Sequence, residues 1–166
     1  PFPSWEADQD LNSAMQNSVN WYFQAIDSQL GINRVQEFLN KIEYGNQTTS
    51  SNLDLYWSDF SLKISPLEQV TLLKKFNTNE FHLNSQNVFS VKNAIKIAST
   101  PNGNFYGKTG TGRVNGQDIN GWFIGYVETS DNSYYFATNI QSDSNATGKK
   151  AFEITSNILK KLHIWN

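Results

Sequence analysis

Apolar residues recur every three or four positions through the first half of the chain, a spacing that predicts amphipathic helices. One apolar stripe lies within residues 11–31 and ends at Gly31, a residue typical of helix ends; its members are Met15, Val19, Tyr22, Phe23 and Ile26. Residues 32–42 carry a second stripe, and residues 87–97 predict one more short helix. The first half is therefore expected to be mainly helical.

Another helix has a clear start signal at Ser65. Ser65 stands at the capping position, Pro66 at the first helical position, and Glu68 where a capping box closes back on the cap. The stretch "SPLEQVTLLKKF" therefore predicts a helix that begins at Pro66.

The hydrophobic period changes in the second half of the chain. Residues 104–112, 121–129 and 133–141 are rich in aromatic and β-branched residues and are separated by turn-forming clusters at 114–120 and 129–133, which predicts three antiparallel strands. A closing amphipathic helix is predicted within residues 146–164, with a buried side made of Phe152, Ile154, Ile158, Leu159 and Leu162.

Helices followed by strands and a last helix on the sheet predict an α+β architecture. We expect an antiparallel sheet flanked by helices, with a helical region at about 11–96 and the sheet and closing helix at about 104–163. By its length of 166 residues the chain is expected to belong to one domain.

Composition narrows the possible functions. The chain is 38% hydrophobic and 14% aromatic, as expected of a globular domain with a core. Its net charge of −2 argues against nucleic acid as a partner, because nucleic-acid-binding domains normally present a basic face. No apolar run reaches the roughly 18 residues of a transmembrane helix, so no membrane span is expected in this chain.

Metal ligands are scarce in the sequence. Cysteine is absent, and the two histidines, His82 and His163, have no cluster of acidic residues at ligand spacing. We therefore expect neither a metal site nor a cofactor.

Candidate chemistry lies in "NFYGKTGTGRV", residues 104–114, where Lys108 and Thr109 stand among glycines. A phosphate-binding loop requires four residues between its glycines and a helix after Gly-Lys-Thr. Here only three residues separate Gly103 from Gly107, and a predicted hairpin follows. Both the spacing and the context favour a strand that presents Lys108 and Thr109 to a different kind of anion.

Lys-Thr-Gly on a strand is one of three motifs of the serine-active penicillin-recognising enzymes. The lysine supplies positive charge to the substrate carboxylate, the threonine hydroxyl donates to the same group, and Gly110 leaves room for an acyl group against the backbone. The alternative is a glycine-rich edge strand with a solvated lysine, and the motif alone does not exclude it.

Companion motifs favour the first interpretation. Ser18 and Asn20 form a Ser-x-Asn motif in the first helical region, "YGN" at 44–46 follows the second helix, and "YWSDFSLKISPLEQV" comes next. In this order, and with "GWFIGYVET" after the Lys-Thr-Gly hairpin, these stretches resemble class D β-lactamases and the related sensor domains of BlaR/MecR-type penicillin receptors. The similarity covers nearly the whole chain.

The resemblance implies a sheet flanked by helices, a helical subdomain, and a β-lactam pocket between them. Ser18 resembles the hydroxyl that relays a proton between the active-site lysine and the β-lactam nitrogen, and Trp57 resembles the tryptophan that leans over the catalytic lysine. The backbone N–H of Thr111 would supply half of the oxyanion hole. The implied catalytic residues are Ser18 and Lys108, and the implied substrate-binding residues are Asn20, Trp57, Thr109, Gly110 and Thr111; residues 44–46 match a signature that is mainly structural.

One family motif is missing. No Ser-x-x-Lys occurs in the 166 residues, and the stretch from Ser61 to Lys63 is one residue too short. In these proteins the nucleophilic serine and its lysine precede Ser-x-Asn, and a hydroxyl nucleophile needs an adjacent base. We therefore expect residues 1–166 to be the C-terminal part of a single penicillin-binding domain that is acylated at a serine outside this chain.

A second departure concerns Asn20, which stands where class D hydrolases usually have valine. In those enzymes the catalytic lysine is carboxylated in an apolar pocket, and the carbamate activates the deacylating water. A polar side chain nearby makes the carbamate less persistent and the acyl-enzyme longer-lived. Asn20 therefore favours a sensor, for which a stable acyl-enzyme is the signal.

The main hypothesis is thus a β-lactam-binding sensor domain at the extracytoplasmic face of the cell membrane, attached to a membrane region and signalling the induction of antibiotic resistance. One alternative is a class D β-lactamase, secreted or carried as a lipoprotein, that hydrolyses the same acyl intermediate. The other is a non-catalytic structural fragment.

Overall fold

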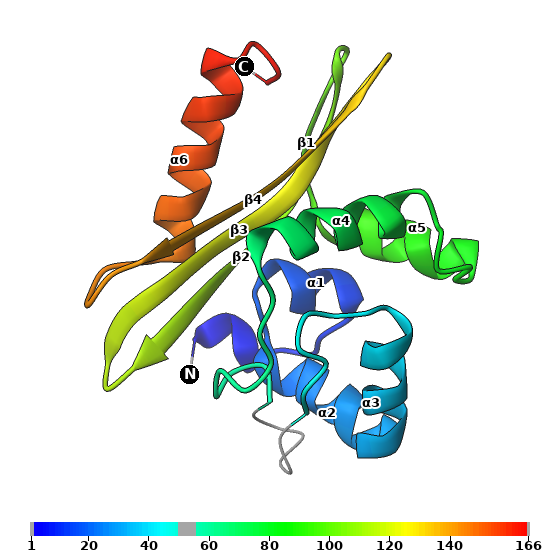
Figure 1. The fold of residues 1–166 in the computed structure, drawn as a ribbon, viewed down its shortest axis with the longest axis vertical. Coiled ribbons are helices and arrows are strands. Elements are labelled where there is room, and N and C mark those ends of the chain that lie inside the picture. Colours follow the sequence, from blue (N-terminus) through cyan, green and yellow to red (C-terminus); the bar gives the residue numbers. More distant parts are fainter. Residues whose placement is uncertain (1, 50–55, 166) are drawn as a thin grey trace. The chain divides into compact units, whose positions relative to one another are not determined.

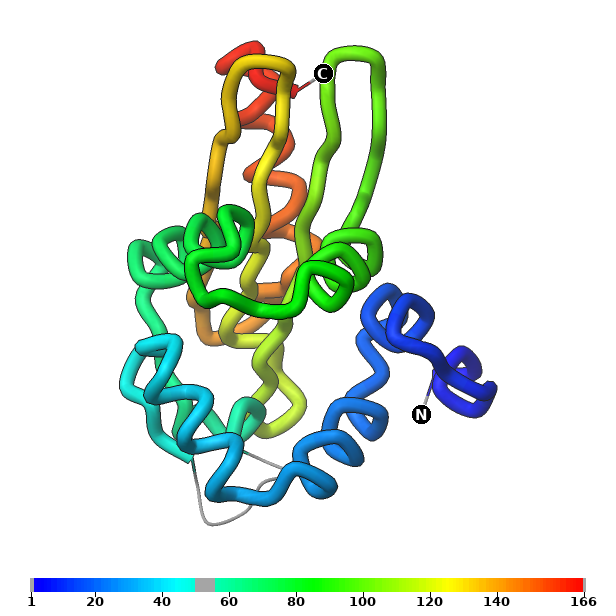
Figure 2. The backbone as a smooth tube through the Cα atoms, turned by 90° about the vertical axis from the view of Figure 1, so that its right-hand side faces the viewer, coloured from blue at the N-terminus to red at the C-terminus, as the bar shows by residue number. Residues whose placement is uncertain are grey.

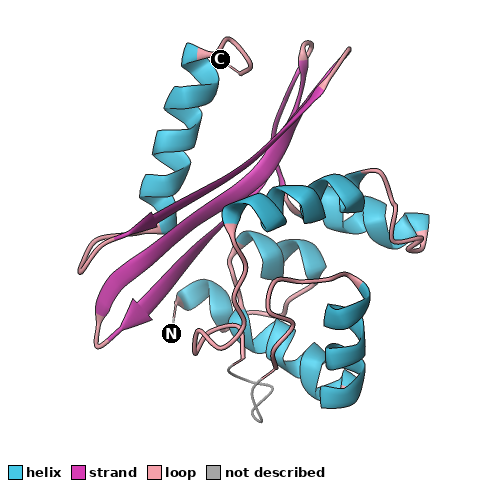
Figure 3. Cartoon of the chain, viewed as in Figure 1, coloured by secondary structure: helices cyan, strands magenta, loops and turns pink. Residues whose placement is uncertain are grey.

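The computed structural model describes residues 2–49 and 56–165. Helices come first and strands follow, before one last helix, as the α+β prediction requires (Figure 3). In chain order the elements are the 3₁₀ helix η1 (Pro3–Trp5), α1 (Leu11–Gln16), α2 (Asn20–Leu30), α3 (Ile32–Lys41), α4 (Pro66–Asn77), α5 (Ser85–Ala94), β1 (Lys96–Thr100), β2 (Gly103–Val114), β3 (Gln117–Thr129), β4 (Ser133–Gln141) and α6 (Gly148–Lys161).

Internal contacts divide the chain into two compact units. The described residues of Pro1–Glu68 and Lys75–Ile95 form the helical unit, and those of Gln69–Lys74 and Lys96–Asn166 form the sheet unit. Helix α4 contributes to both, because its middle turns group with the sheet. Each unit has its own buried cluster of side chains.

The predicted helix at 11–31 is in fact two helices, α1 and α2, in the helical unit (Figure 1). Ser18, at φ 53°, ends α1. Its N–H donates to the carbonyl of Met15, and the N–H of Val19 donates to that of Ala14. This is a Schellman ending, which usually has glycine at its left-handed position. The sequence did not reveal the break because serine occupies that position.

The predicted start of α4 is confirmed. The Ser65 N–H donates to Oε2 of Glu68 at 2.8 Å, and the Glu68 N–H donates back to Oγ of Ser65 at 3.2 Å. Hydrogen bonds to the Glu68 carboxylate from the Ser65 side chain, and then from the Ser65 N–H, lower the pKa of the Glu68 carboxyl, since they favour its charged form. The helix begins at Pro66, as the sequence predicts.

The sheet unit is a four-stranded antiparallel sheet in the order β1-β2-β3-β4 (Figure 1). Strand β1 was not predicted, because its first residues were assigned to the helix that ends at Ala94 as α5. The turn predicted at 114–120 is present but shorter than expected. Only Asn115 and Gly116, at φ 49° and 78°, lie between β2 and β3. Two positive φ values are the signature of a tight type I′ hairpin, so β3 begins four residues earlier than expected.

Helix α6 runs along one face of the sheet (Figures 1 and 2). Between them lies a core of Phe105, Phe123, Val127, Ala151 and Leu159, with Phe152 packed against it. The predicted buried side of α6 is correct for Phe152 and Leu159 but wrong for Ile154, Ile158 and Leu162, which are 42%, 47% and 61% exposed. The buried face is instead Gly148, Ala151, Thr155 and Leu159, because small residues let the helix approach the strands closely.

Candidate functional site

The predicted site residues fall into two groups, one in each compact unit. Lys108, Thr109, Gly110 and Thr111 are consecutive on β2 in the sheet unit. In the helical unit, Ser18 lies in the turn before α2, Asn20 is the first residue of α2, and Trp57 lies in a turn before α4.

The β2 group lies on a strand edge. Strand β1 pairs with β2 only through Gly103–Tyr106. Across the described residues, the segment Gly107–Val114 therefore has β3 as its one strand neighbour. An edge of this kind presents backbone N–H and C=O groups that an extended ligand can pair with. All four predicted β2 residues lie on this segment.

Side chains on the β2 edge alternate between the two faces of the sheet. Phe105 packs against α6, which places Thr109 and Thr111 on the α6 face as well. Lys108 shares the opposite face with Tyr106, whose ring stacks on Tyr126. A ligand along the edge would thus meet the ammonium group from one face and the two hydroxyls from the other.

The Lys108 side chain is held close to the strand. Its Nζ donates to the carbonyl oxygen of Thr109 at 2.9 Å. The side chain is half-buried, and burial lowers the pKa of its ammonium group below the ordinary value. A lysine of lowered pKa gives up a proton more readily, and its charged form attracts an anion more strongly where water is partly excluded.

Gly110 is not required by packing. A Cβ added at this position would touch only Cβ of Trp122, at an ordinary 3.8 Å. At Gly107, by contrast, an added Cβ would lie 2.7 Å from the ring of Phe123. The missing side chain at Gly110 therefore fits the expectation that an acyl group needs room against this backbone.

Ser18 is exposed, and its left-handed φ of 53° is unusual for a residue other than glycine. Such conformations cost free energy and are concentrated at functional sites. The turn also places Asn20 at the start of α2, where its side chain is half-buried. The Schellman ending of α1 accounts for this backbone conformation, and the role of the Ser18 hydroxyl stays a prediction.

Ser18→Gly is expected to be more stable than Ser18→Ala by about 1 kcal/mol, because glycine avoids the Cβ penalty of the left-handed region. Chemical denaturation of the two variants measures the difference. At Ser28, inside α2, the same pair is expected to reverse its order, since glycine destabilises a helix interior by about 1 kcal/mol. Equal stabilities of the two Ser18 variants would contradict the left-handed turn.

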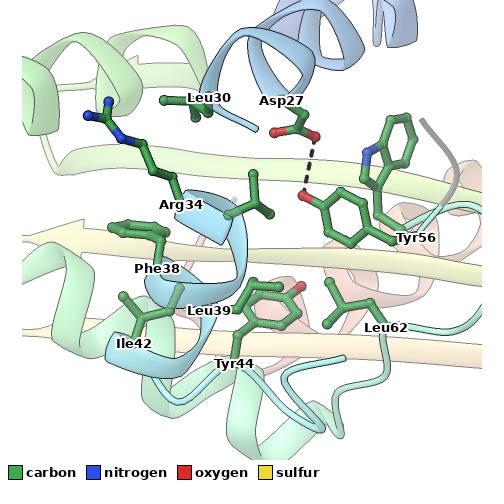
Figure 4. Close-up of a pocket in the computed structure, with 11 residues that line it drawn as sticks. Asp27, Leu30, Arg34, Phe38, Leu39, Ile42, Tyr44, Tyr56 and Leu62 are labelled. Carbon is green, nitrogen blue, oxygen red and sulfur yellow. Dashed lines mark hydrogen bonds between the residues drawn. The ribbon is translucent and has the colours of Figure 1, made fainter. Parts of the chain in front are cut away.

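Trp57 lines a cavity of about 600 Å³ in the helical unit (Figure 4). The hydroxyl of Tyr56 donates to Oδ2 of Asp27 at 3.2 Å across this cavity. Burial, and then the negative charge of Asp27, raise the pKa of Tyr56, so its hydroxyl stays protonated. The remaining lining is mainly apolar: Leu30, Arg34, Val35, Phe38, Leu39, Ile42, Tyr44 and Leu62. Sequence patterns did not indicate the hydrogen-bonded pair of Tyr56 and Asp27.

The "YGN" stretch at 44–46 packs against residues 61–64, which follow the turn that carries Trp57. Gly45 has a φ of 48°, and an added Cβ would clash with the backbone of Lys63. Asn46 accepts from the N–H of Lys63 at 2.9 Å and donates to the carbonyl of Ser61 at 2.8 Å. These contacts agree with a mainly structural role for the stretch.

Two further features of the structure concern metal-ligand clusters and membrane-spanning helices. In the parts of the chain that the structure describes, no group of three or more His, Cys, Asp or Glu side chains is placed to hold a metal ion. None of the helices in residues 2–49 and 56–165 combines the length and apolar character that crossing a membrane requires.

One structural neighbour of the β2 edge was missed by sequence reasoning. The first residue of α6, Gly148, lies directly against Thr109 and Gly110. The only sequence signal was local: "ATGKK" contains a threonine cap before a helix, and Thr147 does accept from the N–H of Lys150 at 3.2 Å. That signal predicts where the helix starts but not what it touches.

Comparison with known proteins identifies the family. The model of the penicillin binding protein transpeptidase domain matches residues 1–160. The chain belongs to this family. It is 44% identical over 164 residues to the methicillin resistance mecR1 protein of Staphylococcus aureus. The matched region covers 99% of this chain but only 28% of that protein.

Solved structures agree with the sequence comparison. The C-terminal domain of the Bacillus licheniformis BlaR penicillin-receptor superposes with a TM-score of 0.95 at 46% identity, over all of this chain and 67% of that one. A class D β-lactamase from Bacillus subtilis superposes with a TM-score of 0.92 at 37% identity, covering 68% of that chain. The resemblance to penicillin receptors and class D β-lactamases is therefore confirmed, as is the α+β fold.

Proposed function

We propose that this chain is the C-terminal part of a β-lactam sensor domain, which belongs to a membrane receptor and is acylated by penicillins at a serine outside residues 1–166. One observation carries the proposal: Lys108 and the hydroxyls of Thr109 and Thr111 flank an exposed strand edge from opposite faces. This arrangement suits a carboxylate-bearing ligand that pairs with the strand. The names of the receptor relatives support the same reading.

In the proposed reaction, the β-lactam lies along the β2 edge. Lys108, Thr109 and Thr111 hold its carboxylate, and the Thr111 N–H donates to the developing oxyanion. The serine oxygen attacks the lactam carbonyl, the C–N bond breaks, and Ser18 passes the serine's proton to the leaving nitrogen. The product is an ester of the serine with the opened antibiotic.

The sensor is favoured over a hydrolase by Asn20, at the start of α2. A polar side chain there disfavours a carboxylated lysine and hence the activation of a deacylating water. The second candidate, a class D β-lactamase, is kept because the Bacillus subtilis enzyme has the same fold. Attachment to a membrane and exposure outside the cell are part of the sensor proposal, and fractionation of cells that express the complete gene tests both.

The decisive experiment uses the complete domain and a chromogenic cephalosporin, with hydrolysis followed by absorbance and the adduct by intact mass. We expect one stoichiometric adduct that lasts for hours. Steady turnover would contradict the sensor proposal and support the class D β-lactamase. If neither an adduct nor turnover is observed, the chain would instead be a non-catalytic structural fragment. Cephalosporin that has already been hydrolysed serves as the control, because it cannot acylate.

A further inference from the structure

The first turn of α6 is built into the Lys-Thr-Gly segment. The N–H of Gly148 donates to Oγ1 of Thr111 at 2.9 Å. A Cβ at position 148 would lie 2.6 Å from the carbonyl oxygen of Gly110 and 2.9 Å from Cβ of Thr109. Real Cβ atoms essentially never approach backbone this closely, so a side chain at Gly148 would push α6 away from β2. Gly148 is buried in this contact.

The chain just before α6 is fixed on the neighbouring strand as well. Gly121 of β3 stands opposite Thr111 in the sheet register. An added Cβ at Gly121 would clash with the backbone of Thr147 and lie 2.9 Å from the carbonyl oxygen of Ala146. The N–H of Ala146 donates to the carbonyl oxygen of Asp118 at 2.7 Å. The Gly148 N–H is thereby held at a fixed place relative to Thr111.

This contact determines how the Thr111 hydroxyl can be used. A hydroxyl has one proton to donate and two lone pairs that accept. Because one lone pair accepts from the Gly148 N–H, the proton remains available to a ligand on the exposed side of Thr111, and accepting a hydrogen bond strengthens the donation. The same contact limits rotation of the side chain.

We propose that Gly148 is a positioning residue, which sets the Thr111 hydroxyl as a donor to the carboxylate of the β-lactam. The proposal rests on the proposed function, because it concerns how the same edge selects a carboxylate. The start of α6, and not β2 alone, then determines the selectivity for a carboxylate.

The test compares acylation of the complete domain by benzylpenicillin and by its methyl ester, which lacks the carboxylate charge. The readout is the ratio of the two second-order rate constants, acid over ester. Thr111→Val keeps the shape but removes the hydroxyl, and is expected to lower this ratio about tenfold. Gly148→Ala, which displaces the N–H, is expected to lower it similarly, whereas Thr111→Ser is expected to retain the wild-type ratio.

Gly116→Ala is the matched control for Gly148→Ala. Gly116 lies in the β2–β3 turn at φ 78° with no other group within 4 Å of an added Cβ, so its replacement strains the backbone without touching Thr111. We expect it to lose stability and keep the wild-type ratio. An unchanged ratio in Thr111→Val, or in folded Gly148→Ala, would overturn the inference. Absence of any acylation in the wild type would instead overturn the proposed function.

Discussion

Replacing Lys108 by alanine is expected to slow acylation by penicillins about 100- to 1,000-fold, the usual cost of removing one preorganised electrostatic group from an acyl-transfer site. The ammonium lies beside the β2 edge, tethered to the carbonyl of Thr109 and half-buried, where partial exclusion of water strengthens its attraction for an anion. The rate constant is measured with a fluorescent penicillin on the complete domain.

Lys149→Ala provides the matched control, since Lys149 is exposed in the first turn of α6 and its removal changes the net charge by the same amount. We expect that variant to react at nearly the wild-type rate. Lys108→Arg keeps the charge but not the geometry, and is expected to fall between the two. An equal loss of acylation rate in Lys149→Ala would mean that the effect of Lys108→Ala comes from the change in net charge alone. An unchanged acylation rate in Lys108→Ala would contradict the proposed role of Lys108 in binding the carboxylate.

The sequence predicted the elements and motifs that depend on neighbouring residues. The α4 capping box joins Ser65 to Glu68, three residues away, and local spacing was enough to predict it. The strand character of the Lys-Thr-Gly segment followed from its residue types and from the hairpin after it. The helix break at Ser18 is equally local, but its usual marker, glycine, is absent.

Features set by distant contacts were not predictable in this way. The α6 sequence contains two faces with apolar character, and hydrophobicity alone favoured the one with Ile154 and Ile158. The sheet instead contacts Gly148 and Ala151, because close approach to the strands depends on small side chains. The contact between Gly148 and Thr111 joins residues 37 positions apart, and no periodic pattern encodes that distance.

The other large effect is expected in the core beneath the β2 edge. Phe123→Ala is expected to lower the free energy of unfolding by about 3–5 kcal/mol, because its ring is 0% exposed and its removal leaves a cavity. The ring packs at centroid distances of 6.0, 5.1 and 5.0 Å on Phe105, Phe136 and Phe152. Val114→Ala, at the exposed end of β2, is expected to cost under about 1 kcal/mol. Urea denaturation compares the two.

A second substitution tests whether Phe123 is also the reason for glycine at 107. A Cβ at Gly107 would lie 2.7 Å from two atoms of the Phe123 ring, so Gly107→Ala alone is expected to destabilise the sheet unit by forcing the ring aside. Removing the ring first opens that space. The double variant is therefore expected to lose less stability than the sum of the single losses, by about 1 kcal/mol or more. Strict additivity would mean that the remaining neighbour, the carbonyl oxygen of Ile124 at 2.9 Å, sets the limit at Gly107. In that case the backbone pairing of β2 with β3, rather than the aromatic core, would account for the glycine next to Lys108.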